Sequence, residues 1–577
     1  MSRFLGSLII FLSLFFTVLA KIQLLAQNFK LADGSVRNVK LIWTSDTKAE
    51  VFRVYRKSLN SDFTILATGS FRSYDDYEVP EGPHVYQVWS LGDPVEGSNL
   101  LTKNPPQAEN LQGFSTYDNI KSDKLDLRSK IYLDGVYYDY HMGWDNNGTT
   151  GIKELTSIDG FTFTEHRIVL TRKELCTNDK SGYCKLESVS FSQHPTTKEV
   201  VMWAHWEEKD GYKKGYVAVA YGKPGQERWK FGGSFRPLNH DSRDLNFFAD
   251  DDHSGYVISS TNTNRDMNIY RLTPDWHHIK ELVVTVLKGQ AREAPAMIHY
   301  GGMYYLFTSI ATGWYPSTGK YISAPKLSGP WSENRVMGNL GGFSAQSGDI
   351  IKIGPTYVMR ANKWRIPDID PPGTPLRQVI LPISLSNGTA TYAFYPKVLY
   401  RDTGDLVGVY GLQNGRIVSI GRPVTSTGAD KDHPEYLATS GVNTKAQRFY
   451  KPTAVPFIHA IDLGAVYEIS HIELTTSLVP GSESAAQFII EGSLQVTGPF
   501  TPFLDQSNNT RVGFVSAPVL NNFNCRYVAL RVHKITNMHN KRPATPGIHE
   551  FTVFGKAPLN PTLASSQAGE SQNNGFT

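Results

Sequence analysis

The segment from Gly289 to Tyr305 contains an arginine–glutamate pair, Arg292 and Glu293, directly before two short apolar runs. Gly301 and Gly302 separate these runs, which is typical of a tight turn between two strands. A carboxyl group where a strand emerges from a sheet can lose part of its hydration, and its pKa then rises into the range of a general acid. Glu293 is therefore the first candidate for acid chemistry. The alternative is an exposed ion pair that only solubilises a loop.

The elements that would hold this residue belong to a long, aromatic-rich chain. With 577 residues, the chain is long enough for roughly three or four domains. It contains 29 Tyr, 29 Phe, 10 Trp and 49 Gly and only 19% charged residues, which favours compact β-rich domains over disorder or coiled coil. The net charge is +4 and the basic residues are scattered, so nothing indicates a nucleic-acid partner.

Residues 1–20 are typical of a signal peptide. Arg3 is followed by an apolar run from Leu8 to Leu19, and Val18-Leu19-Ala20 resembles a cleavage site. The apolar run is short for a membrane span and no later run is long enough, so we predict a secreted, extracellular protein without membrane insertion.

Cysteine and asparagine residues fit this compartment. Cys176 and Cys184 are separated by polar and turn residues, which suits a disulfide-closed loop, and Cys525 is expected to be buried. Three triplets that match glycan acceptors make the protein a candidate glycoprotein; they begin at Asn147, Asn387 and Asn508.

The first unit of the mature chain, residues 21–100, is predicted to be a small β-sandwich. Apolar and polar residues alternate in Val39–Trp43, Val51–Arg56 and Val85–Trp89, with turn residues between these segments. The spacing resembles a fibronectin type III domain. Such a module is usually a spacer, and we expect that role here.

Residues 105–421 contain many short apolar segments that end in paired aromatic residues or in a glycine or aspartate turn. Ile131–Tyr138, Val200–Trp206 and Met303–Phe307 are examples, and the pattern returns roughly every 50 to 70 residues. No helical period is sustained. The pattern predicts an all-β propeller, in which the innermost strands surround one central pocket.

Several motifs follow one another in this region: Gly233–Asp252, which contains Ser242-Arg243-Asp244; Gln290–Ala296; Thr312–Trp314; Gly329–Trp331; and Gln346-Ser347. In this order they resemble glycoside hydrolase family 43, and most of all its exo-β-1,3-galactanase-like branch. The resemblance covers roughly residues 118–398 and implies a five-bladed β-propeller.

That family cleaves glycosidic bonds with inversion, with carboxylic groups on both sides of the bond. The resemblance implies that Glu293 is the general acid and that Asp244 positions it. Two facing carboxylates raise one pKa, so that a proton is kept for the leaving oxygen. Gln346 matches a glutamine that helps to hold the attacking water, and Asp126 lies about where other members carry the base. Both stay candidates for the water side.

The substrate-binding candidates lie in or near these motifs. Met142 departs from the branch, because it stands where a substrate-contacting glutamate is expected. Trp144 and Trp314 lie beside glycine and polar residues, so sugar stacking and core packing are both open for each. The full set of substrate-binding candidates is Arg292, Arg243, Glu187, Trp314 and Trp144. No His/Asp/Glu set has metal-ligand spacing, so we predict no metal and no cofactor.

The C-terminal part begins after a turn-rich run, Pro423–Pro434, that is typical of a linker. Segments of residues 434–556 resemble a coagulation factor 5/8 type C (discoidin) domain, a jelly roll that often binds galactose-type sugars. Residues 557–577 are rich in Ser, Gln and Asn and are predicted to be disordered.

Together these observations predict a secreted all-β protein: a five-bladed β-propeller flanked by an N-terminal fibronectin type III-like sandwich and a C-terminal discoidin-like jelly roll. We expect it to hydrolyse a galactose-containing polysaccharide or glycoprotein glycan. The alternative is a catalytically inactive, lectin-like protein on the same folds. Asp244 and Glu293 favour the enzyme, whereas Met142 favours the lectin.

Overall fold

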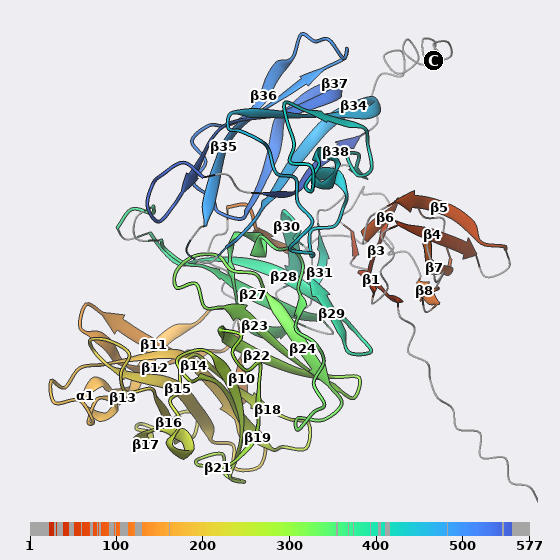
Figure 1. Ribbon diagram of the computed structural model, residues 1–577. Helices are drawn as coiled ribbons and strands as arrows, with labels where there is room; N and C mark the ends of the chain where they lie inside the picture. Colours follow the sequence, from red (N-terminus) through yellow and green to blue (C-terminus); the bar gives the residue numbers. More distant parts are fainter. Residues whose placement is uncertain are drawn as a thin grey trace, which may run out of the picture.

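The fold is given by a computed structural model (Figure 1). It describes residues 22–27, 30–31, 38–45, 51–58, 61–69, 73–77, 79, 82–91, 97–98, 100–103, 114–121, 130–160, 162–353, 356–366, 369–372, 374–392, 394–401, 406–409, 416–479, 481, 483–544 and 547–556. The signal peptide (1–20), the tail (557–577) and Asp126 lie outside the described residues, so the predictions made for them are not tested.

The all-β prediction is confirmed. Within the described ranges there is one α-helix, Arg172–Leu175 (α1), which begins at a capping box of Thr171 and Glu174. Three 3₁₀ turns also occur there: Pro237–Asn239 (η1), Gly342–Ser344 (η2) and Glu435–Thr439 (η4). No helix among the described residues has the length and apolarity to cross a membrane.

The N-terminal unit has two sheets. The first has the order β1-β3-β6 and the second β5-β4-β7-β8. Their strands are β1 (Ile22–Gln27), β3 (Asn38–Ser45), β4 (Val51–Ser58), β5 (Thr64–Gly69), β6 (Ser73–Tyr77), β7 (His84–Leu91) and β8 (Leu101–Lys103). Alternating residues of both sheets, among them Trp43, Phe52 and Tyr86, form one buried core, as the period-two pattern predicts. Its identity as a fibronectin type III domain stays a prediction.

The central region consists of five consecutive four-stranded antiparallel sheets, each with its strands in chain order. The first has β10 (Ile131–Leu133), β11 (Val136–Asp145), β12 (Gly148–Ser157) and β13 (Thr164–Thr171). The second has β14 (Cys184–Gln193), β15 (Val200–Glu208), β16 (Tyr216–Gly222) and β17 (Lys230–Phe235). The third has β18 (Leu245–Ala249), β19 (Gly255–Thr261), β20 (Asp266–Leu272) and β21 (Ile279–Val286). The fourth has β22 (Arg292–Tyr300), β23 (Met303–Ile310), β24 (Lys320–Ala324) and β25 (Arg335–Val336). The fifth has β26 (Gln346–Ile353), β27 (Thr356–Lys363), β28 (Arg377–Ser386) and β29 (Thr389–Tyr392).

Neighbouring central sheets pack against one another through shared apolar clusters. One cluster joins the first and second sheets, another the second and third, a third the third and fourth, and a fourth the fourth and fifth. Middle strands are therefore covered on both faces, and every residue of β19 is buried. The first strands β14, β18, β22 and β26 contact one another in that order. This is the arrangement expected of consecutive propeller blades.

A further sheet links distant parts of the chain, in the order β2-β31-β30-β9. Its strands are β2 (Lys30–Leu31), β9 (Phe114–Asp118), β30 (Lys397–Arg401) and β31 (Leu406–Val409). The residue after β9, Asn119, hydrogen-bonds to β28 at Ile380, which attaches this sheet to the fifth central sheet.

The C-terminal unit is built on one seven-stranded sheet. Its strands are β32 (Arg416–Ile417), β33 (Val424–Ser426), β34 (Phe457–Thr476), β35 (Ser484–Ser493), β36 (Thr501–Gln506), β37 (Phe514–Asn537) and β38 (Ile548–Lys556). The run 423–434, expected as a linker, differs from that expectation because β33 pairs with β34. The unit's likeness to a discoidin domain stays a prediction.

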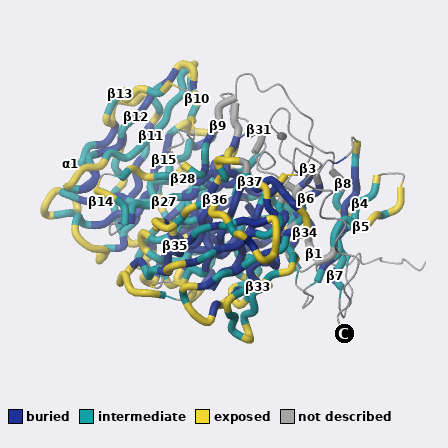
Figure 2. The backbone as a smooth tube through the Cα atoms, turned by 90° about the horizontal axis from the view of Figure 1, so that it is seen from above, coloured by how far each residue is buried: buried dark blue, intermediate teal, exposed yellow. Residues whose placement is uncertain are grey.

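The C-terminal unit packs directly on the central sheets. Phe514 joins the core cluster of the fourth and fifth sheets, where its ring lies 5.1 Å from that of Phe343. Figure 2 shows buried residues along the strands and exposed residues mainly in the connecting loops. The unit therefore lies against the same sheets that carry Glu293 and Gln346.

Candidate active site

The hairpin predicted around Glu293 is present. Strands β22 and β23 pair with Tyr300 opposite Met303, and Gly301 and Gly302 both have positive φ, 59° and 72°, as a tight two-residue turn requires. Glu293 lies at the other end of β22, beside a break in the strand register after it. The turn thus closes one end of the hairpin and leaves the carboxyl group at the other.

The same irregularity occurs in three first strands. The register shifts directly after Glu187 in β14, after Glu293 in β22 and after Gln346 in β26. Such bulges re-aim side chains next to functional sites. Asp244 directly precedes β18, whose neighbours are β14 and β22. Because these first strands lie side by side, four residues scattered over the sequence come together.

Glu293 is a buried carboxyl group, with 9% of its surface exposed. Burial, and next the negative charge of Asp244, raise the pKa of Glu293 to about 8. Its Oε1 accepts a hydrogen bond from Gln346 Nε2 at 2.7 Å, and its Oε2 accepts one from Asn264 Nδ2 at 3.3 Å. A carboxyl group with this pKa keeps its proton at neutral pH and can donate it.

Gln346 is held from several sides. The indole Nε1 of Trp364 donates to its Oε1 at 2.6 Å, and its Nε2 also donates to Ser309 Oγ at 3.0 Å. Because an indole N–H can only donate, the amide orientation is fixed by Trp364. Both amide hydrogens are used by Glu293 and Ser309, so a water could only bind at the remaining lone pair of Oε1.

Asp244 is clamped between the two neighbouring first strands. The hydroxyl of Ser188 donates to its Oδ1 at 2.9 Å, and the backbone N–H of Ala294 donates to its Oδ2 at 3.2 Å. Both donors have positive φ, 49° and 48°, so the bulges that carry Glu187 and Glu293 also aim these groups at Asp244. Burial raises the pKa of Asp244, whereas His205 and these donors favour its ionised form.

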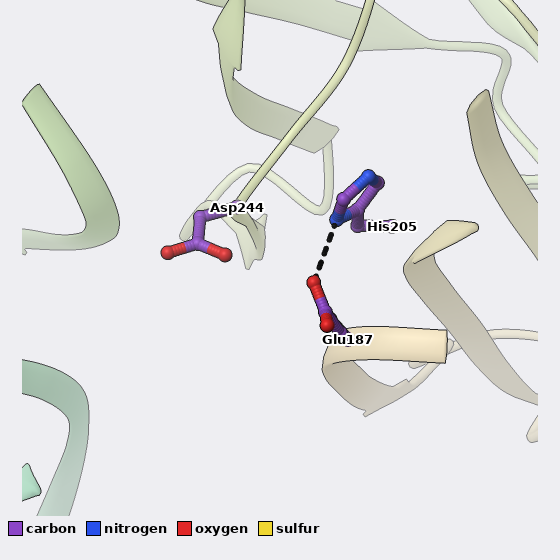
Figure 3. Close-up of side chains that lie close together, drawn as sticks. All are labelled: Glu187, His205 and Asp244. Atoms are coloured by element: carbon purple, nitrogen blue, oxygen red, sulfur yellow. Dashed lines mark ion pairs between the residues drawn. The ribbon is translucent and has the colours of Figure 1, made fainter. Parts of the chain in front are cut away.

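A buried histidine connects Glu187 to a second glutamate. Glu187 and His205 are direct partners across β14 and β15, and His205 Nδ1 lies 3.4 Å from Glu187 Oε2 (Figure 3). The other ring nitrogen, Nε2, lies 3.2 Å from Glu207 Oε1. Burial alone would lower the pKa of His205, but the two carboxylates outweigh it and raise this pKa. The two carboxylates therefore favour the protonated, cationic form of His205.

The same contacts keep both glutamates ionised. Burial favours a higher pKa for Glu187, but the contact with His205 and the hydroxyl of Tyr212, which donates at 2.7 Å, bring it below its ordinary value. Glu207 accepts hydrogen bonds from two backbone N–H groups and from Arg243, and its pKa is likewise lowered in spite of burial. Glu187 therefore offers a partly exposed carboxylate beside the acid pair.

The two arginines predicted to bind substrate make contacts within the protein. Arg243 Nη1 pairs with Glu207 at 3.0 Å, and its Nη2 donates to the carbonyl of Tyr212. Arg292 is 2% exposed and hydrogen-bonds to the side chain and carbonyl of Thr308 and to the carbonyl of Thr318. Burial lowers the pKa of Arg292 to about 9. Their roles as substrate ligands stay predictions, and the geometry gives both a supporting role.

The two tryptophans of interest are exposed, with 54% of Trp144 and 49% of Trp314 open to solvent. Core packing therefore does not account for either side chain. Trp314 lies edge to face with Trp364, with ring centroids 5.4 Å apart, and so sits near Gln346. Trp144 lies near the end of β11, and no contact in the described residues ties it to Glu293.

Sequence reasoning gave no functional role to His205, Glu207, Tyr212 or Trp364. One signal was available: β15 carries His205 and Glu207 on the same face, after a run of five apolar residues. Charged residues inside a buried strand need partners, so this pair pointed to a polar site. Trp364 had a weaker signal, because Asn362-Lys363-Trp364 stands where the galactanase-like branch has Asp-Arg-Trp, but only the pairing of β26 and β27 brings it to Gln346.

Two groups of side chains have a metal-like geometry. In each group, one ligand atom per residue lies within 4.8 Å of the others; the groups are Glu187, His205 and Asp244, and Asp250, Asp251 and His299. Protonated His205 has no lone pair to give, so a metal would have to displace its proton. In the second group, Asp250 and Asp251 follow β18 at the end opposite Asp244, and His299 lies on β22. The expectation of no metal stays a prediction.

Comparison with known proteins relates this region to one family. The sequence profile of the Glycosyl hydrolases family 43 matches residues 200–346, which contain Asp244 and Glu293 and end at Gln346. No curated protein sequence matches the chain.

Two solved structures of exo-β-1,3-galactanases are similar to the chain. The one from Clostridium thermocellum has 22% sequence identity and a TM-score of 0.46, and the match covers 77% of this chain and 97% of the other. The one from Phanerochaete chrysosporium, with β-1,3-galactotriose, has 19% identity and a TM-score of 0.47, with coverage of 76% and 100%.

Proposed function

We propose that the protein is an inverting glycoside hydrolase that acts on a galactose-containing glycan of the β-1,3-galactan type. The observation that carries the proposal is Glu293, a buried carboxyl group whose pKa is raised to about 8 beside Asp244. Proton donation to the leaving oxygen requires a carboxyl group that is still protonated at the working pH. The sequence resemblance supplies the substrate class, and the profile match over residues 200–346 agrees with the reaction type.

Asp244 positions the acid in this mechanism. Its carboxylate is fixed by Ser188 and by the N–H of Ala294, the residue next to Glu293, so acid and neighbour move as one unit. Its charge raises the pKa of Glu293, which holds the proton until a sugar oxygen takes it. Ionised Glu187, within 4.8 Å of Asp244 and His205, is placed to accept a hydroxyl hydrogen bond from the sugar.

The water side has two candidates, Asp126 and Gln346. An inverting enzyme places its base roughly 6.5–9.5 Å from the acid, which leaves room for a water and the sugar. Gln346 hydrogen-bonds directly to Glu293 at 2.7 Å, so it is placed to orient the acid. We therefore assign the base role to Asp126 and keep Gln346 as a further water ligand through its Oε1.

The roles proposed for the separate units of the chain are based on the sequence. We infer that the five central sheets are the blades of a β-propeller, that the N-terminal sandwich is a spacer and that the C-terminal unit binds carbohydrate. The signal peptide predicts secretion, which would give the enzyme access to a polysaccharide or a glycoprotein glycan.

A lectin-like protein is the second candidate. It is favoured by Met142, which lies in β11, where the galactanase-like branch has a glutamate, and which accepts only a weak contact from the hydroxyl of Thr149 at 3.5 Å. A sulfur in place of a carboxylate removes one ligand for sugar hydroxyls. In contrast, Glu293 and Asp244 are both present, so the sequence keeps the two carboxyl groups of the acid side.

Substitution of the acid tests the proposal. Glu293→Gln keeps the shape and removes the transferable proton, so turnover of β-1,3-galactan should fall by roughly 10²- to 10⁴-fold. An aryl β-galactoside with an activated leaving group needs less protonation and should lose less. Glu281→Gln, on β21, is the matched control and should be unchanged. If the protein binds galactan but does not hydrolyse it, and if Glu293→Gln leaves this binding unchanged, the protein is a lectin and the enzyme proposal is wrong.

A further inference from the structure

A hollow adjoins the candidate active site and is lined by the fourth and fifth central sheets, the segment after β9 and the C-terminal unit. It is open to solvent on one side, and about 610 Å³ of free space is found there when the open space at its mouth is counted. One wall is Trp364, whose indole donates to Gln346, which in turn donates to Glu293. Two side chains, Trp364 and Gln346, would therefore lie between a ligand in this hollow and the acid.

Cationic side chains from three separate segments meet in this hollow. Lys363 ends β27 and Arg377 begins β28, and the two are direct partners in the strand register. Like charges directly opposite each other in an antiparallel pair are destabilising. Arg511, from the connection between β36 and β37 of the C-terminal unit, lines the same hollow.

Basic residues outnumber acidic ones among the described residues that line the hollow. Among its described lining residues, Lys121, Lys363, Arg377 and Arg511 are basic, and Asp370 is the one carboxylate. Asp370 pairs with Arg377 at 3.2 Å, yet Arg377 Nε is buried without a hydrogen-bond acceptor in the described residues. Burial, and next Arg511 and Arg377, lower the pKa of Lys363 to about 7, as expected where positive charge is crowded.

Aromatic surface completes the hollow. Trp314, with 49% of its surface exposed, and Trp364 both line it, with an angle of 71° between their ring planes. An exposed indole face packs against the C–H surface of a sugar ring, and arginine binds carboxylate or sulfate through two parallel hydrogen bonds. The combination suits a sugar that carries an anionic group.

We propose that this hollow is a subsite for an anionic sugar residue, a uronic acid or a sulfated sugar, within the glycan whose bond lies at Glu293. The inference rests on the proposed function for the place of the bond, on Arg377 and Arg511 for the charge of the ligand, and on the two tryptophans for its sugar ring. It makes the C-terminal unit part of the substrate site through Arg511.

Direct binding to the full-length protein tests the subsite. Isothermal titration calorimetry would compare methyl β-D-glucuronide and galactose 6-sulfate with neutral methyl β-D-galactoside. We expect at least one anionic probe to bind at least about tenfold more tightly than the neutral one, and this preference to fall as salt is added. Preference for the glucuronide alone assigns the site to a carboxylate, and preference for the sulfate alone assigns it to a sulfate ester.

Substitutions of residues that line the hollow test whether the preference for anionic probes arises there. Arg511→Gln, at an exposed position, should weaken the affinity for the anionic probe by about tenfold and change the affinity for the neutral probe by no more than about twofold. Arg377→Gln should act in the same way, and thermal melting shows whether either variant stays folded. Arg228→Gln, exposed between β16 and β17, is the matched control. Equal affinity for neutral and anionic probes, or an Arg511→Gln effect no larger than that of the control, would overturn the subsite.

The outcome is separable from that of the proposed function. If the protein hydrolyses neutral β-1,3-galactan and does not prefer anionic probes, the proposed function stands and the proposed subsite is wrong. If the protein binds the anionic probes through Arg511 but hydrolyses none of the galactans, the proposed subsite stands and the proposed function is wrong.

Discussion

The side-chain amide of Gln346 donates a hydrogen bond from Nε2 to Oε1 of Glu293 over 2.7 Å. Trp364 fixes this direction, because its N–H occupies the amide oxygen. The other oxygen, Oε2, accepts a weaker hydrogen bond from Nδ2 of Asn264 at 3.3 Å. There Asn264 presents an amide whose Oδ1 is buried without a partner among the described residues. If that amide is turned over, Oδ1 accepts the proton of Glu293.

Gln346→Leu should change the pH dependence of turnover. The hydrogen bond from Gln346 favours the ionised form of Glu293 and so lowers its pKa, against the larger effect of burial. Its loss should move the basic limb of the pH–rate profile to higher pH, and poorer orientation of the acid should lower kcat by about tenfold or more. Gln193→Leu, at the far end of β14, is the control. A shift to lower pH would contradict the assigned contact.

Asp244→Asn should shift the same limb in the opposite direction. The charge of Asp244 is the second largest cause of the raised pKa of Glu293, so its removal should lower that pKa below about 8. The basic limb of kcat/KM should then move to lower pH. Asp252→Asn, in an exposed turn, is the control. If turnover falls without any shift of the limb, Asp244 acts by contact alone and its charge has no part in tuning the acid.

His205→Gln tests the buried ion pairs. Removal of the cation leaves Glu187 and Glu207 with fewer partners, and loss of one partner of a buried pair costs about 3–5 kcal/mol. The pKa of His205 is raised in the folded state, so its stabilisation is full below about pH 6.5 and is lost as the pH rises through the folded value. Urea unfolding at pH 6 and pH 9 should give the larger loss at pH 6. The exposed His278→Gln should cost little at either pH, and an equal loss for His205→Gln at both would mean that the ring is neutral.

The sequence predicts the local parts of this site well and its cross-strand contacts poorly. The Gly301-Gly302 hairpin depends on neighbouring residues and was predictable. Arg292 and Glu293 were grouped as one pair, yet successive residues of a strand face opposite sides, so Glu293 reaches the site while Arg292 turns to Thr308.

The partners of Glu187 and Gln346 could not be predicted for a related reason. His205 meets Glu187 through the register of β14 and β15, and Trp364 reaches Gln346 only because β26 and β27 pair. Such registers follow from side-chain packing on both faces of the sheets and are not encoded by short motifs. The place of Arg511 is even harder to predict from the sequence, because this residue belongs to the C-terminal unit and not to the central sheets.

Asp126→Asn tests the water side of the mechanism. Gln346 touches Glu293 directly, so a base across the bond must come from elsewhere, and Asp126 is the candidate from the sequence. Its loss should lower turnover by roughly 10²- to 10⁴-fold. Azide, a nucleophile that needs no base, should restore turnover and yield a glycosyl azide of inverted configuration. Asp134→Asn, in the exposed turn between β10 and β11, should be silent and unaffected by azide. A nearly silent Asp126→Asn, together with loss of turnover in Gln346→Leu, would assign the water to Gln346.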